Sequence, residues 1–126
     1  MKNPKTSVLI LESSPLFRMA LTEFLLKNTG YEVIHCSAAE DHLLLSNYTS
    51  LGYLIIDVSQ KIREAIAMSK SLKKAIPCLK ILATDYKLQP AIARKCFYHQ
   101  IDGYISKNAS VEEFKQALQT LKNGEQ

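Results

Sequence analysis

The most informative part of this chain is residues 52–57, which read Gly52-Tyr53-Leu54-Ile55-Ile56-Asp57. An uninterrupted apolar run of this length is typical of a central parallel strand, because helices cover both faces of such a sheet. Only the carboxyl end of the strand then reaches solvent, and open α/β sheets bind their ligands at that end. Asp57 occupies this end, which makes it the first candidate for a functional carboxylate.

Three further polar residues follow short apolar runs elsewhere in the chain. Because the carboxyl ends of parallel strands lie at one edge of a sheet, we expect their side chains to gather around Asp57. Two acids, a hydroxyl and an amine at that edge predict a single site. The three residues are Glu12 after residues 8–11, Thr84 after residues 81–83, and Lys107 after residues 104–106.

Short apolar runs alternate along the chain with segments of helical period. This alternation predicts an α/β fold with one doubly wound, five-stranded parallel sheet of flavodoxin-like (βα)5 type and strand order 2-1-3-4-5. Strands are predicted at residues 7–11, 31–36, 52–56, 79–83 and 103–105. Helices are predicted from a cap at Ser13 or Ser14 to Gly30, over residues 38–48, 60–75 and 90–98, and from a capping box at Ser110 to Asn123-Gly124.

Length and composition indicate a single globular domain. The chain has 126 residues, 47% of them hydrophobic, which is enough for a full core. No apolar run approaches the ~20 residues of a membrane span, and residues 1–5 do not resemble a secretion signal, so a cytoplasmic location is expected. The three cysteines, Cys36, Cys78 and Cys96, lack the spacing of a disulfide framework or a zinc site.

The net charge of +4 is unevenly distributed along the chain. Residues 61–100 contain nine lysine and arginine residues but only two acids, Glu64 and Asp85. A basic surface attracts nucleic acids or acidic proteins. No aromatic-interleaved or helix-turn-helix pattern accompanies the charge, which favours its interpretation as a solvated helical face.

Four segments resemble the motifs of bacterial response-regulator receiver domains. The entries to the first and last helices, Pro15-Leu16-Phe17-Arg18 and Lys107-Asn108-Ala109-Ser110, are similar to those of the NarL/FixJ (LuxR-type) subfamily. The resemblance covers the chain from about Thr6 to Gly124 and implies a receiver domain at residues 5–124. The segments are Leu11-Glu12-Ser13-Ser14-Pro15-Leu16-Phe17-Arg18, Ile55-Ile56-Asp57-Val58-Ser59, Ile81-Leu82-Ala83-Thr84, and Asp102-Gly103-Tyr104-Ile105-Ser106-Lys107-Asn108-Ala109-Ser110.

The resemblance implies transfer of a phosphoryl group from the phosphohistidine of a sensor histidine kinase to Asp57. It also implies that Lys107 supplies a cation and Thr84 a hydroxyl to the transferred group, and that Tyr104 is an aromatic switch that rotates in response. A bound Mg²⁺ ion would take its protein ligands from Glu12, Asp57 and the main-chain carbonyl of Ser59.

Three departures from the family pattern fall near this site. Family members usually carry two acids after the first strand, whereas this chain has Glu12 followed by Ser13, which predicts a Mg²⁺ site that is weak or lost. The Met-Pro-Gly that commonly follows the acceptor is absent after Asp57, which predicts a shortened loop. Gln100 stands where many relatives have glycine, which predicts a strained residue with φ > 0 and a rearranged helix end.

The main hypothesis is therefore a signalling protein and not an enzyme. We expect the receiver domain of a DNA-binding transcriptional regulator, with an impaired metal site, that signals mainly through protein contacts. A weak homodimer would form through the first and last helices, and DNA would be bound only through an effector domain outside this chain. The alternative is an ordinary phosphorylatable receiver in which Glu12 and water replace the missing acid. A small flavodoxin-like enzyme or nucleotide-binding module is less supported, because the four glycines form no phosphate-binding pattern.

Overall fold

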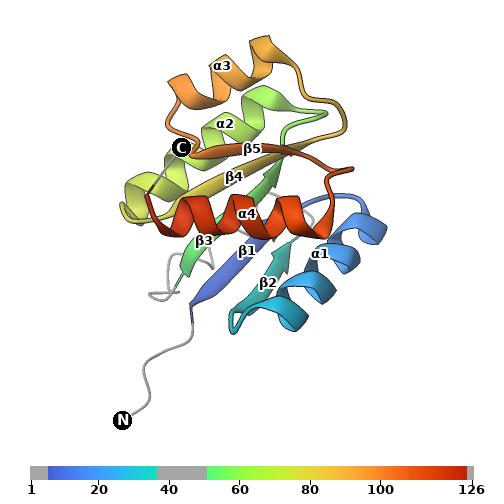
Figure 1. The fold of residues 1–126 in the computed structure, drawn as a ribbon. Helices are drawn as coiled ribbons and strands as arrows, with labels where there is room; N and C mark the ends of the chain where they lie inside the picture. The colour runs from blue at the N-terminus through green and yellow to red at the C-terminus, as the bar shows by residue number, and fades with distance from the viewer. Residues whose placement is uncertain (1–5, 37–50, 125–126) are drawn as a thin grey trace.

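A computed structural model describes residues 6–36 and 51–124 of the protein. Five parallel strands form one sheet in the order β2-β1-β3-β4-β5, which confirms the predicted topology. The helices pack on both faces of this sheet (Figure 1). The strands are β1 (Ser7–Leu11), β2 (Glu32–Cys36), β3 (Leu51–Asp57), β4 (Lys80–Asp85) and β5 (Gly103–Ser106). The helices are α1 (Pro15–Asn28), α2 (Ile62–Ala75), α3 (Pro90–Tyr98) and α4 (Val111–Lys122).

The predicted boundaries agree closely with this structure. β1 and α3 begin and end where the sequence predicts, while β3 and β4 extend to include the polar residues Asp57 and Asp85. The helix predicted at residues 38–48 lies outside the described residues. A loop of four residues, 58–61, separates Asp57 from α2. Within residues 6–36 and 51–124, no helix is both long enough and apolar enough to cross a bilayer.

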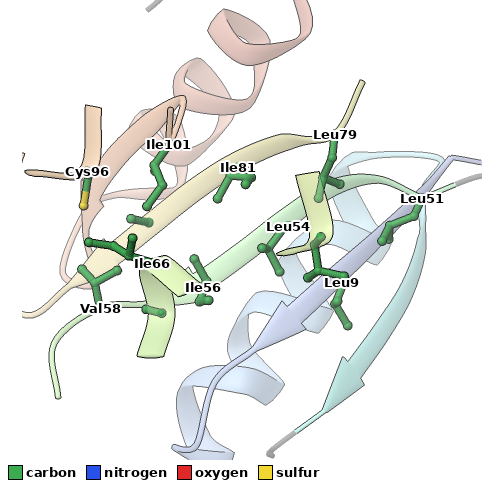
Figure 2. Packing of buried hydrophobic residues seen from close by; sticks show 13 residues of the cluster. Leu9, Leu51, Leu54, Ile56, Val58, Ile66, Leu79, Ile81, Cys96 and Ile101 are labelled. Atoms are coloured by element: carbon green, nitrogen blue, oxygen red, sulfur yellow. The ribbon is translucent and has the colours of Figure 1, made fainter. Parts of the chain in front are cut away.

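Two hydrophobic clusters cover the two faces of the sheet. Neighbouring residues of β3 point alternately into one cluster or the other, so Leu54 and Ile56 join the first and Tyr53 and Ile55 join the second. This alternation explains the continuous apolar run, because both faces of the strand are buried. The first cluster, drawn in Figure 2, includes Leu9, Ile81, Ile66, Leu72, Cys96 and Ile101 from β1, β4, α2, α3 and the segment before β5. The second includes Val8, Ile10, Leu21, Leu25, Phe114 and Leu118 from β1, α1 and α4.

The ends of α1 and α4 follow from local hydrogen bonds. Ser14 caps α1 by accepting from the Phe17 amide at 3.4 Å, and Pro15 occupies the first turn. The helix ends at Asn28, and the C-cap is Thr29, not the predicted Gly30. The Thr29 hydroxyl donates to the Leu25 carbonyl at 2.7 Å and satisfies one of the terminal acceptors. At α4 the predicted capping box of Ser110 is confirmed.

Gln100 adopts the left-handed conformation that its position predicts, with φ of 67°. The end of α3 is nevertheless regular, so the expected rearrangement was wrong. The Ile101 amide donates to the Cys96 carbonyl at 3.0 Å and the Gln100 amide to the Phe97 carbonyl at 3.1 Å, which is the Schellman pattern. The Nζ atom of Lys73 also donates to the Gln100 carbonyl at 2.6 Å. These contacts hold a strained residue in place without a glycine.

Candidate functional site

Three charged side chains converge at the carboxyl edge of the sheet. Glu12 follows β1, Asp57 ends β3, and Lys107 follows β5, so the lysine extends past β4 to reach both acids. Its Nζ lies 2.9 Å from Glu12 Oε1 and 3.2 Å from Asp57 Oδ1. The side chains are 2%, 10% and 3% exposed for Glu12, Asp57 and Lys107 respectively. Lys107 and Glu12 therefore lie next to Asp57 as expected from the strand ends, and the shorter of the two Lys107 contacts is with Glu12.

Lys107 stays cationic although it is buried. Burial alone would lower the pKa of this ammonium group, but the carboxylates of Glu12 and Asp57 outweigh burial and raise the pKa above its ordinary value. Two aromatic rings add to the favourable surroundings, since Nζ lies 4.3 Å from the centre of the Tyr86 ring and 5.2 Å from that of Phe17. The formal charge of the three groups together is therefore negative by one.

The remaining contacts leave one carboxylate oxygen available. Glu12 Oε2 accepts from the Ser14 amide at 2.9 Å, so both oxygens of this side chain have partners. Asp57 Oδ1 accepts from the amide and the hydroxyl of Ser59, at 2.9 and 2.6 Å. Asp57 Oδ2 has no hydrogen-bond partner among residues 6–36 and 51–124. This oxygen is the part of the site that can act as a nucleophile or a ligand.

The residues of this site do not form a ready cage for a divalent cation. In the part of the chain that the structure describes, no three His, Cys, Asp or Glu side chains come together. Ser13, which follows Glu12, is exposed. Ser59 contacts Asp57 through its amide and hydroxyl, and the metal role of its carbonyl stays a prediction. Mg²⁺ requires nearly octahedral oxygen ligands, and the Lys107 ammonium lies against both carboxylates that would be among them.

Thr84 lies directly beside Asp57 in the sheet. The two residues are paired in the register of β3 and β4, and the Thr84 carbonyl accepts from the Val58 amide at 2.9 Å. The Thr84 hydroxyl is buried and donates to the Ile56 carbonyl at 3.5 Å. A hydrogen bond of this length is weak, so little energy opposes rotation of the hydroxyl toward another acceptor.

Tyr104 is held by Asp85, an acid for which the sequence predicted no role. Its hydroxyl donates to Asp85 Oδ2 at 2.7 Å and accepts from the Gln89 amide at 3.1 Å. Asp85 is buried and also accepts from the Tyr86 amide at 2.8 Å. Burial first, and the hydrogen bond to Asp85 second, raise the pKa of Tyr104 to about 12. The signal in the sequence was an acid immediately after Thr84, at the end of an apolar strand.

Comparisons with known proteins agree with this geometry. No family model matches the chain, and no curated protein has a significantly similar sequence. A response regulator from Thermotoga maritima superposes with a TM-score of 0.84 at 15% identity, covering 95% of this chain and 99% of its own. The chain has the fold of a response-regulator receiver domain.

Two further structures with the receiver fold are close in shape to this chain. A LuxR-family two-component response regulator from Aurantimonas sp. has a TM-score of 0.83 and 18% identity, with 98% of this chain and 89% of its own covered. A response regulator from Burkholderia pseudomallei with a phosphorylated aspartic acid, a calcium ion and citrate has a TM-score of 0.79 and 21% identity, with 95% and 71% covered. The TM-scores of these two superpositions establish a shared fold despite the low sequence identity.

Proposed function

We propose that residues 5–124 form the receiver domain of a cytoplasmic, LuxR-type response regulator with Asp57 as the phosphoacceptor. The observation that carries this proposal is the convergence of Asp57, Glu12 and Lys107 at the carboxyl edge of a receiver-type sheet. The phosphorylated aspartic acid of the Burkholderia protein supports it, because that protein shares the fold. A sensor histidine kinase is the proposed phosphoryl donor.

In this proposal Asp57 Oδ2 attacks the phosphorus atom of a phosphohistidine. An O–P bond forms, the N–P bond to the histidine breaks, and the imidazole leaves with the electron pair of that bond. Lys107 lies next to the same carboxylate and would balance the charge of the new phosphoryl oxygens. Thr84 would supply its hydroxyl to the phosphoryl group after breaking its 3.5 Å hydrogen bond to the Ile56 carbonyl. Tyr104 would act as the switch only by giving up its contact with Asp85.

We further propose that Mg²⁺ binding is impaired, so that the domain signals mainly through protein contacts. Mg²⁺, when bound, offsets charge on the phosphoryl oxygens, and Glu12, Asp57 and the Ser59 carbonyl would hold it. The Lys107 ammonium already pairs with both of these carboxylates, so a metal ion would have to compete with it. The proposed partners are a second copy, bound weakly through α1 and α4, and DNA bound through an effector domain outside this chain.

Phosphorylation with acetyl phosphate in the presence of Mg²⁺, followed by intact-mass measurement, tests the proposal. An impaired site should give slow and incomplete addition of one phosphoryl group, and Asp57→Asn should give none. Rapid, complete modification would favour the alternative in which Glu12 and water replace the missing acid. Modification of Asp57→Asn to the same extent as the wild type would refute the assignment of Asp57.

A further inference from the structure

The positive charge of this protein is concentrated in one segment of the chain. Residues 61–100, which contain α2, β4 and α3, hold nine of the sixteen lysine and arginine residues and two of the twelve acids. One of these acids, Asp85, is buried and bonded to Tyr104. Glu64 is therefore the only exposed acid of this segment. Figure 1 shows α2 and α3 together on one face of the sheet.

The outer face of α2 carries a regular row of exposed bases. Arg63, Lys70 and Lys74 stand at positions i, i+7 and i+11, and the intervening position i+4 is Ala67. Residues at this spacing share one side of a helix. The opposite side is buried and includes Ala65 and Leu72. The row spans about 16 Å of helix, and we call it the α2 basic row.

The bases of this row have no acidic partner in the described part of the chain. Within residues 61–100 the ion pairs of the structure involve only Lys73, which binds Asp102 at 2.9 Å and faces the end of α3. In contrast, the opposite layer contains an ion pair within each of its helices. Lys27 binds Glu23 at 2.7 Å in α1, and Lys115 binds Glu112 at 3.8 Å in α4. The α2 basic row is therefore an uncompensated cationic surface.

The composition of this surface favours phosphate groups over a protein partner. Protein interfaces gain affinity from a buried core of aromatic and other apolar anchors and are depleted of charge at that core. All large exposed apolar residues of the described chain lie outside α2: Leu16, Met19, Leu26, Tyr86, Leu88, Phe97, Tyr98 and Val111. A membrane surface would also use such residues for insertion. Single-stranded nucleic acid would use aromatic stacking, which α2 does not offer.

Contrary to the expectation that DNA is bound only through an effector domain outside this chain, we propose that the α2 basic row binds the phosphate backbone of duplex DNA without sequence specificity. A duplex carries one negative charge per about 1.7 Å of its axis, so a row of about 16 Å faces several phosphates at once. Contacts of lysine and arginine with phosphates fix the position of a protein on DNA but do not read its sequence. This surface is independent of Asp57, so the proposal stands apart from phosphoryl transfer.

Fluorescence anisotropy with a labelled duplex of about 20 base pairs tests the proposal, across about 50 to 200 mM salt. The wild type should bind, with an affinity that falls steeply as salt rises. The triple variant Arg63→Gln, Lys70→Gln and Lys74→Gln should bind about tenfold more weakly or worse at the low-salt end. The slope of log K against log salt should flatten by about 3, because each phosphate contact contributes roughly 0.9.

A matched control removes the same charge from the opposite layer. The triple variant Lys27→Gln, Lys115→Gln and Lys122→Gln should keep most of the binding, and circular dichroism should show both triples folded. Equal loss in the two triples, or no binding by the wild type at low salt, would overturn the proposal. Tighter binding to a single-stranded oligonucleotide, to polyglutamate or to phosphatidylserine vesicles would also overturn it and would assign the surface to that partner instead.

Discussion

Lys107 provides the single positive charge at a site with two buried carboxylates. An unpaired buried charge is costly, so the position of the ammonium between Glu12 and Asp57 stabilises the unmodified state. The same position makes the lysine a competitor of any divalent cation. In the proposed impairment of Mg²⁺ binding, the serine at position 13 and the contact of Lys107 with both carboxylates would act in the same direction.

Substitution of Ser13→Asp should restore part of the Mg²⁺ affinity. The added carboxylate supplies both charge and a hard oxygen ligand, so the Kd for Mg²⁺ should fall by on the order of tenfold. A titration monitored by NMR chemical shifts at Glu12 and Asp57 measures this change. Ser13→Asn is the matched control, since it adds a similar volume without charge. Equal affinities for the two variants would show that the metal is held elsewhere or not at all.

Asp85 should control the ionisation of Tyr104. The neutral phenol donates to the carboxylate, and a phenolate would be repelled by it, so Asp85→Asn should lower the pKa of Tyr104 from about 12 toward its ordinary value. The pKa of Tyr104 should not return fully to its ordinary value, because burial is the larger cause of the shift and is kept in this variant. NMR of a ring-labelled Tyr104 through alkaline pH gives the result. An unchanged pKa would show that the contact with Asp85 has no energetic weight.

The pH dependence of stability follows from the sign of this shift. The pKa of Tyr104 is raised in the folded state, so its contribution to stability is complete below pH 10 and is lost as the pH rises toward 12. In Asp85→Asn this loss of stability should be confined to a narrower pH range above 10.

At the scale of single elements, local patterns in the sequence predicted most of the fold. The apolar run before Asp57 marked β3, and Ser110 with Glu113 marked the start of α4, because these signals involve residues within one element. Local patterns could not predict that Lys107 contacts Glu12 or that Tyr104 contacts Asp85. Both contacts join different strands, and their geometry depends on side-chain reach across the edge of the sheet.

The backbone just after α3 is strained at Gln100, and a glycine at this position should relieve the strain. A side chain in the left-handed region costs about 1–2 kcal/mol, and glycine avoids this cost but loses some entropy on folding. Gln100→Gly should therefore raise the free energy of unfolding by about 0.5–1 kcal/mol, measured by urea denaturation. The carbonyl that accepts from Lys73 is kept. Gln100→Ala retains the strain and should show no gain, so equal stability of the two variants would argue against strain.

The two N-terminal caps should differ in strength. The Ser110 hydroxyl accepts from the Glu113 amide at 3.1 Å, and the Glu113 carboxylate accepts from the Ser110 amide at 3.0 Å. Ser110→Ala should lower the free energy of unfolding by about 1 kcal/mol. Ser14→Ala should cost less, because its hydrogen bond is longer and is not reciprocated by a carboxylate. Parallel urea denaturation of both variants compares them, and the reverse order would contradict this assignment.

At the scale of the whole molecule, the two helical layers present different surfaces to partners. The layer of α2 and α3 is strongly basic, whereas α1 and α4 each contain an ion pair within the helix. On the outer side of α1, Leu16, Met19 and Leu26 are 79%, 68% and 61% exposed. Their spacing of three and seven residues places them on one side of the helix. An apolar row of this kind suits a two-fold interface with a second copy.

The apolar row of α1 should mediate weak self-association that depends on protein concentration. Sedimentation velocity of the wild type should show partial dimerisation, because the row is small compared with the area that obligate dimers bury. Met19→Lys places a charge in the middle of the row and should leave a monomer, whereas Leu88→Lys changes an exposed residue of another surface and should not. On the proposed impairment of Mg²⁺ binding, beryllofluoride with Mg²⁺ should change the distribution little, because Lys107 competes for the carboxylates that would hold the ion. A clear switch from monomer to dimer on adding beryllofluoride and Mg²⁺ would instead show that Asp57 controls assembly. If Met19→Lys dimerised like the wild type, the interface would have to lie elsewhere.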